Sequence, residues 1–160
     1  MKGRLKEYAL VAEIVGAIAV VISLIYVGVG VRQNTEAVQV ANHQAIVAMD
    51  ISKNSWLRDP QFAAAHALAR EDFEKVTPEQ LSQLRAFMAD QVNIWEFAFI
   101  THSNGAMSDN IWEGFDSFYC AEIQSKLGRW FWDRGGANFS PQFADYVNSI
   151  INASGSELAN

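Results

Sequence analysis

Residues Ala9–Val31 form an almost uncharged apolar run, and this run constrains the fold more than any other feature of the chain. It holds 23 residues with a single charged side chain, Glu13. At about 1.5 Å of rise per residue, a helix of this length spans about 34 Å, which matches the ~30 Å hydrocarbon core of a bilayer. We therefore expect residues 9–31 to be a transmembrane helix.

The apolar run differs from a cleaved signal peptide. Three basic residues precede it, as they do in signal peptides, but the apolar core of a signal peptide holds about 7–15 residues and ends at small residues. This run is longer and passes into the segment Arg32–Thr35, which has no such cleavage pattern. The sequence thus predicts an uncleaved signal anchor and a single-pass protein.

Basic residues are more frequent before the run than after it. Three lie at positions 2, 4 and 6, whereas Arg32 follows the run and the next basic residue is Lys53. Cytoplasmic flanks carry the excess of basic residues. We expect a bacterial inner-membrane protein with residues 1–8 as a cytoplasmic tail and the C-terminal domain in the periplasm. The single cysteine, Cys120, forms no internal disulfide and does not decide the compartment.

The part of the chain beyond the run is acidic. Of the 12 basic residues four lie in residues 1–32, and of the 18 acidic residues two do, so 8 bases face 16 acids in residues 33–160, a net charge of −8. An acidic domain repels phosphate backbones, which argues against nucleic-acid binding. The length of this part is enough for one compact domain with its own core.

The apolar pattern continues past the span at helical spacing. Its members are Val38, Ala41, Ala45, Met49 and Trp56. This spacing predicts an extramembrane stalk helix over residues 32–59, continuous with the span. Asp59-Pro60 should end it, because the residue before a proline is pushed out of the α region.

Local signals predict further helices and no strand. A short helix is expected near 61–71. Thr77, Pro78 and Gln80 form a capping box for a helix that should end at Asn104-Gly105. Further helices are expected over about 110–127, ending at Gly128, and from Ser140-Pro141 to about Asn152. The expected fold is all-α, with a transmembrane helix continuing into a long extramembrane helix, then a small bundle of about four helices in residues 60–152 and a flexible tail at 153–160.

Small residues form a stripe along the span. The members are Ala12, Gly16, Ala19, Ser23 and Gly30, which fall within about 40° of one line at ~100° per residue. Small residues let transmembrane helices approach closely, so the stripe favours a contact with another helix. Glycine and alanine are also common in such helices without any partner. The partner would be an integral membrane protein complex or a second copy, and membrane lipid would cover the rest of the span.

The sequence contains no pattern that indicates catalysis or a cofactor. The three histidines, His43, His66 and His102, lie outside the span, so none can hold a haem or pigment inside the membrane. No metal-ligand spacing, nucleophile elbow or glycine-rich phosphate loop is present. Cys120 is expected to be a buried structural thiol, with a reactive thiol as the alternative. We expect a non-enzymatic protein without catalytic residues, metal or cofactor.

Aromatic residues are frequent in the C-terminal part. The candidates for a pocket or a partner surface are Trp95, Trp112, Trp130, Phe131 and Trp132. They could equally form the core of a small helical domain, which needs large side chains. The segment around Trp130 could also face a protein partner or the lipid headgroups. The tetrapeptide Asn93–Glu96 recurs as Asn110–Glu113, which we interpret as coincidence.

Several motifs together resemble a known group. An anchor with Val-Ile-Ser-Leu-Ile-Tyr-Val at 21–27 leads into Arg32–Thr35. A Trp95-Glu96 pair, a late Trp132 and a Phe-Ser-Pro-x-Phe element at 139–143 follow. The chain resembles a broad group of uncharacterised bacterial single-span membrane proteins, with a C-terminal helical domain of unknown function. The resemblance implies an architecture and assigns no chemistry.

These observations lead to two hypotheses. The first is a membrane accessory or assembly subunit that docks on a larger membrane protein complex through its transmembrane helix and helical domain. The second is a membrane-anchored periplasmic sensor or small-ligand-binding module. A cavity among Trp95, Trp112 and Trp132 would favour the second hypothesis, and a fully packed core there would count against it.

Overall fold

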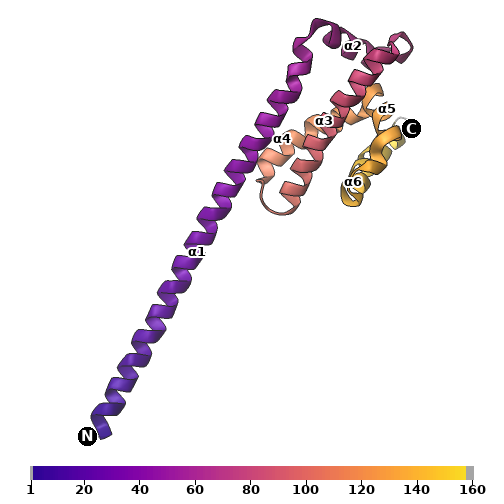
Figure 1. Cartoon of the computed structure of the whole chain (residues 1–160). Coiled ribbons are helices and arrows are strands. Elements are labelled where there is room, and N and C mark those ends of the chain that lie inside the picture. The colour runs from indigo at the N-terminus through magenta and orange to yellow at the C-terminus, as the bar shows by residue number, and fades with distance from the viewer. Residues whose placement is uncertain (1, 158–160) are drawn as a thin grey trace. The chain divides into compact units, whose positions relative to one another are not determined.

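The computed structural model describes residues 2–157 and confirms the expected all-α fold, a long N-terminal helix followed by a small helical bundle (Figure 1). It divides into two compact units, Met1–Val40 and Ala41–Asn160. In the described residues, five α-helices follow α1 and form the bundle, whereas about four were expected. The elements of the described residues are α1 (Lys2–Asn54), η1 (Ser55–Arg58), α2 (Pro60–Glu71), η2 (Phe73–Lys75), α3 (Pro78–Ser103), α4 (Asp109–Gln124), α5 (Lys126–Gly135), η3 (Gly136–Asn138) and α6 (Pro141–Glu157).

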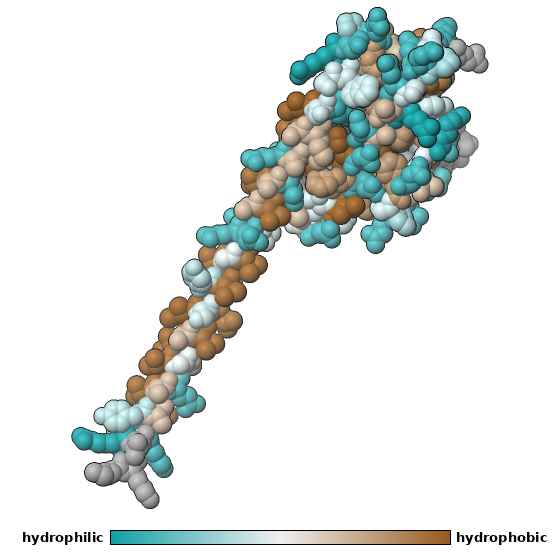
Figure 2. Space-filling view, in the orientation of Figure 1, coloured by the Kyte–Doolittle hydropathy of each residue, from teal (hydrophilic) through white to brown (hydrophobic). Residues whose placement is uncertain are grey.

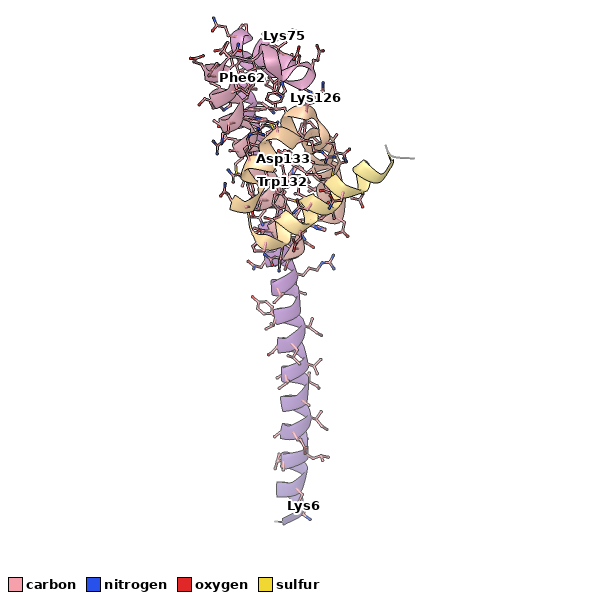
Figure 3. All side chains as sticks on the ribbon, turned by 90° about the vertical axis from the view of Figure 1, so that its right-hand side faces the viewer. Lys6, Phe62, Lys75, Lys126, Trp132 and Asp133 are labelled. Atoms are coloured by element: carbon pink, nitrogen blue, oxygen red, sulfur yellow. The ribbon has the colours of Figure 1, made fainter. Side chains whose placement is uncertain are left out.

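The first unit is the N-terminal part of α1. Every residue from Tyr8 to Val38 is exposed, and the brown, apolar side chains of this segment are visible along the helix in Figure 2. Among the described residues, the helical stretch Tyr8–Arg58 is the one that is long and apolar enough to cross a membrane. The expected tail at 1–8 is helical from Lys2 onward, and Met1 lies outside the described residues. Lys6 lies near the start of this helix (Figure 3).

Helix α1 ends a few residues before the predicted stop at Asp59-Pro60, and a tighter 3-10 turn follows it. α1 stops at Asn54, and the 3-10 helix η1 carries the chain to Asp59. The carboxylate of Asp59 accepts hydrogen bonds from the backbone nitrogens of Gln61 at 2.7 Å and Phe62 at 3.3 Å. Asp59 therefore caps α2, with Pro60 at the first helical position, where its missing N–H costs nothing.

The buried face of α1 matches the expected one only in part. Met49, and Trp56 of η1 after it, are partly buried against the core, as expected. Ile46 is fully buried and Lys53 is 3% exposed, whereas Val38 and Ala45 are exposed. The amide of Asn42 also faces the bundle and donates a hydrogen bond to the carbonyl of Ala106 at 3.1 Å. The face contains a polar and a charged residue, and a search for apolar periodicity therefore misses it.

Helix α3 supplies more of the buried apolar side chains in the described residues than any other helix. Its capping box forms as predicted, because Thr77 accepts from the nitrogen of Gln80 while the Gln80 side chain accepts from the nitrogen of Thr77. The chain turns after α3 at Gly105, whose positive φ of 72° suits glycine, and α4 runs back along α3 (Figure 1). The α3 side chains buried in the core include Leu84, Phe87, Met88, Val92, Trp95 and Ala98.

Gly128 does not end a helix, which corrects the expectation of a single helix over about 110–127. α4 already ends at Gln124, and Ser125 caps a separate helix, α5, by accepting a hydrogen bond from the nitrogen of Gly128 at 3.1 Å. A Cβ at Gly128 would lie 2.6 Å from the Cα of Ile123. Glycine at this position lets α5 begin in close contact with the end of α4.

The last helix is longer than expected. α6 starts at Pro141, as the Ser140-Pro141 pair predicts, and continues to Glu157, so the expected tail at 153–160 is helical as far as that residue. Residues 158–160 lie outside the described residues. α6 closes the bundle against α3 and α4.

Candidate functional site

The small-residue stripe of α1 is fully accessible. All five members (Ala12, Gly16, Ala19, Ser23 and Gly30) are exposed. A Cβ added at Gly16 or Gly30 would meet nothing within 4 Å. Packing against other described residues therefore does not require glycine at these two positions. Their surface is open to lipid or to another helix.

Three of the five candidate aromatic residues belong to the core. Trp95 is 1% exposed, Phe131 5% and Trp132 6%. The ring of Phe143, which is fully buried, lies 5.2 Å from Trp95 and 6.1 Å from Trp132. Phe143 thus contacts both tryptophans, and this packing counts against the cavity that the sensor hypothesis places among them.

The remaining two tryptophans lie apart from each other and are partly buried. Trp112 stacks on the imidazole of His102 with ring centres 5.0 Å apart, and it contacts Phe99 at 6.0 Å. Trp130 packs on Phe73 at 5.2 Å, and the guanidinium of Arg134 lies over its indole. The structure therefore does not bring the five candidates together into one site. Trp132 lies on α5 (Figure 3).

Asp116 joins three helices through its carboxylate. It accepts hydrogen bonds from the indole nitrogen of Trp95 at 3.0 Å and from the hydroxyl of Tyr146 at 2.6 Å. The thiol of Cys120 lies 3.7 Å from the same carboxylate. Burial and the adjacent Asp116 charge raise the pKa of Cys120 to about 11, so the thiol is inert at neutral pH. Trp95 and Cys120 are both structural in this arrangement.

A different place in the bundle has the features of a binding site. It is a groove of about 630 Å³ between the end of α1, η1 and α4, which we call the Lys53 groove. Its polar lining residues are His43, Asp50, Lys53, Asn54 and Tyr119, and its other lining residues are Leu57, Ile111, Gly114, Phe115 and Phe118. Ligand sites of this size in proteins are mostly apolar with a few placed polar groups.

Lys53 is the buried charge of this groove. Its ammonium donates to the carboxylate of Asp50 at 2.8 Å, and the Lys53 side chain is 2% exposed while that of Asp50 is 33% exposed. Three aromatic rings surround the ammonium, with ring centres 5.6 Å away at Phe118 and Tyr119 and 6.0 Å away at Phe87. The carboxylate and the three ring faces offset part of the cost of removing this ammonium from water.

The hydroxyl of Tyr119 is buried near Asp50 and makes no hydrogen bond of good geometry with any described residue, and Tyr119 as a whole is only 2% exposed. Burial first, and then the charge of the nearby Asp50 and a hydrogen-bonding contact with that carboxylate, raise the pKa of this phenol, so it keeps its proton and remains a donor. The two oxygens of Asp50 already accept from Lys53 and, at 2.9 Å, from the amide of Asn54. A buried polar group without a partner is uncommon in folded proteins and marks a place where another molecule can supply one.

The sequence patterns do not single out Lys53 or Tyr119. One signal is present, because Lys53 follows the buried Ile46 by seven positions and so lies on the same helix face. A charge on a buried face needs a partner, and Asp50 three positions earlier supplies it. The contact with α4 carries no local signal. Comparison with protein-family models, curated proteins and solved structures yields no match for this chain.

Proposed function

We propose that the protein is a non-enzymatic, single-pass accessory or assembly subunit of the bacterial inner membrane, anchored by residues 9–31. The bundle would lie on the periplasmic side, because more basic residues precede the span than follow it. The observation that carries the proposal is the continuous exposure of α1 over residues 9–31, an apolar surface that nothing in the described chain covers. Such a surface is stable in lipid and not in water.

The small-residue stripe supports docking through the anchor. Gly16 lies on the stripe, and Gly28 lies about 160° around the helix from its centre at ~100° per residue. A Cβ at either glycine meets nothing within 4 Å. Both can therefore be enlarged without disturbing the chain itself, which makes them a matched pair.

The test compares Gly16→Leu with Gly28→Leu in the full chain. Each variant is expressed in its own membrane, solubilised in mild detergent and purified, and its co-purifying proteins and assembly size are measured. We expect Gly16→Leu to lose the partner or the second copy and Gly28→Leu to keep it. If the unaltered protein is a lone monomer with no co-purifying protein, the docking proposal fails.

The topology has a separate test. Alkaline phosphatase fused after the C-terminus is active only in the periplasm. We expect activity from this fusion. Activity of a cytoplasmic reporter fused at the same place would place the bundle on the other side of the membrane and would reverse the proposed orientation.

The Lys53 groove favours a second candidate function, a membrane-anchored ligand-binding module. This candidate no longer depends on a cavity among the tryptophans. It rests on an apolar groove of about 630 Å³ that contains a buried ammonium and a buried phenol hydroxyl that makes no hydrogen bond of good geometry with the described residues. The two functions are compatible, because one uses the span and the other uses the bundle.

A further inference from the structure

We propose that the Lys53 groove binds an uncharged, membrane-soluble molecule that is largely apolar and carries a carbonyl oxygen, and that this oxygen accepts hydrogen bonds from Tyr119 and Lys53. The class includes fatty acyl esters and lipid quinones. This inference rests on the second candidate function, ligand binding by the bundle.

The walls of the groove fit an apolar ligand. Phe115 and Phe118 on α4 and Leu57 of η1 all line the groove. Phe118 is 50% exposed and Leu57 is 39% exposed, so the chain leaves large apolar side chains uncovered here. A volume of about 630 Å³ suits an acyl chain or a small ring with a tail.

The charges of the groove favour an uncharged ligand. The ammonium of Lys53 is already neutralised by Asp50 at 2.8 Å. A carboxylate or phosphate bound to the same ammonium would lie close to the carboxylate of Asp50, and like charges repel strongly where water is excluded. A cationic ligand would be repelled by the ammonium of Lys53. A neutral oxygen avoids both repulsions.

The hydrogen-bonding capacity of the groove favours an acceptor. The hydroxyl of Tyr119 makes no hydrogen bond of good geometry with the described residues, and the two oxygens of the nearby Asp50 already accept one bond each, from Lys53 and from Asn54. An ammonium has three N–H donors, and the bond to Asp50 uses one of those of Lys53. A ligand carbonyl has two lone pairs and accepts from both groups at once.

The membrane is the source of the ligand. His43, the first lining residue of the groove, follows Val31 by 12 positions. Even a fully extended chain of this length spans only about 40 Å. With residues 9–31 in the bilayer, the groove is held within that distance of the lipid in any arrangement of the two units.

The test uses the full chain in lipid nanodiscs and three photoreactive probes that differ at one end. They are the methyl ester of a fatty acid carrying a diazirine on its chain, the free acid, and the corresponding alkane, used at a pH where the acid is ionised. After irradiation, mass spectrometry measures labelling of the peptide that contains Phe115 and Phe118. Labelling of residues 9–31 normalises each probe, because the anchor meets lipid in every case.

A matched pair of variants makes the test specific. Tyr119→Phe removes a hydroxyl that makes no hydrogen bond of good geometry with the described residues, and Tyr146→Phe removes one that donates to Asp116 outside the groove. We expect groove labelling by the ester to fall roughly fivefold in Tyr119→Phe, as for loss of one hydrogen bond. Labelling should be unchanged in Tyr146→Phe.

The outcomes separate the two levels of the inference. Stronger labelling of the groove by the ester than by the acid and the alkane supports binding of an uncharged ligand through its carbonyl oxygen. Stronger labelling by the acid keeps ligand binding and overturns the uncharged class. Equal labelling by the alkane, or no effect of Tyr119→Phe, overturns the recognition of an oxygen. Labelling of the anchor alone by all three probes overturns the ligand-binding function itself.

Discussion

The side chain of Glu96 on α3 accepts a hydrogen bond from the backbone nitrogen of Ser140 at 2.7 Å. Ser140 precedes Pro141, the first residue of α6, so a carboxylate from a distant helix caps this helix. The negative charge also lies at the positive end of the α6 dipole. This contact gives Glu96 of the Trp95-Glu96 pair a structural role, while Trp95 is fixed by Asp116.

Glu96→Gln should weaken the cap and Glu96→Ala should remove it. We expect Glu96→Ala to lower the free energy of unfolding by about 1–2 kcal/mol, as for other lost N-caps. Chemical denaturation monitored by tryptophan fluorescence measures this change.

The control for Glu96 lies in the repeated tetrapeptide. Glu113 occupies the equivalent place in Asn110–Glu113 and is exposed. We expect Glu113→Ala to change the free energy of unfolding by less than about 0.5 kcal/mol. Equal losses in both variants would contradict the cap.

Tyr119 and Tyr146 should respond differently to replacement by phenylalanine. Tyr146→Phe removes a hydrogen bond to the Asp116 carboxylate and should cost about 1.5 kcal/mol. Tyr119→Phe removes a hydroxyl that makes no hydrogen bond of good geometry with the described residues and should be neutral or slightly stabilising in the absence of ligand. Thermal or urea unfolding of the two variants side by side checks this. A large loss in Tyr119→Phe would reveal a hydrogen bond of this hydroxyl within the fold.

Asp50 and Lys53 should behave as a coupled pair. Asp50→Asn leaves an ammonium that is 3% exposed without its counter-charge and should cost about 3 kcal/mol. Lys53→Met leaves a carboxylate that is one-third exposed, so we expect a smaller loss of about 1–2 kcal/mol. The double variant should lose less than the two single losses combined. Additive losses in a double-mutant cycle would show that the pair is not coupled.

Cys120 should resist alkylation in the folded protein. Its pKa is about 11, raised first by burial and then by Asp116, against 9.0 for an ordinary thiol. A pKa that is two units higher lowers the thiolate fraction about 100-fold near neutral pH. The rate of alkylation falls by the same factor, because the thiolate is the form that reacts. Iodoacetamide labelling with and without denaturant, followed by mass spectrometry, measures the ratio.

The same shift has a consequence for stability at alkaline pH. The unfolded thiol ionises near 9.0 and the folded thiol near 11. The contribution of Cys120 to stability is therefore complete below pH 9 and is lost as pH rises towards 11. A Cys120→Ser variant should show a weaker decline of stability over this window. An equal decline would assign the effect to other groups.

Local chemistry accounts for the parts of the fold that the sequence predicts. The cap at Thr77, the helix stop at Asp59-Pro60 and the start signal Ser140-Pro141 depend on residues within four positions, so they can be recognised without knowledge of the fold. The apolar run predicts a long exposed helix for the same reason. Gly128 shows the limit of such signals. A glycine at the end of an apolar pattern indicates either a helix stop or a close contact, and only the position of Ile123 decides between them.

The candidate site depends on contacts that are distant in sequence. Lys53 meets Tyr119 only because α4 packs against the end of α1, and no periodicity in either segment encodes that contact. The tryptophans illustrate the converse. Their number suggests a pocket, but Trp95 and Trp132 share Phe143 as a packing partner in the core. Composition indicates which residues are large, and tertiary packing decides whether they surround space or fill it.

The environment of Cys120 makes the natural chain suitable for site-directed spectroscopy. It contains one cysteine, and that thiol stays protonated beside Asp116 at neutral pH. A second cysteine on the exposed surface of α1, for example Ala12→Cys, would react with a maleimide spin label or fluorophore far faster than Cys120. Distances between labels on two copies, or between a label and the bilayer, are therefore accessible without removing the native thiol.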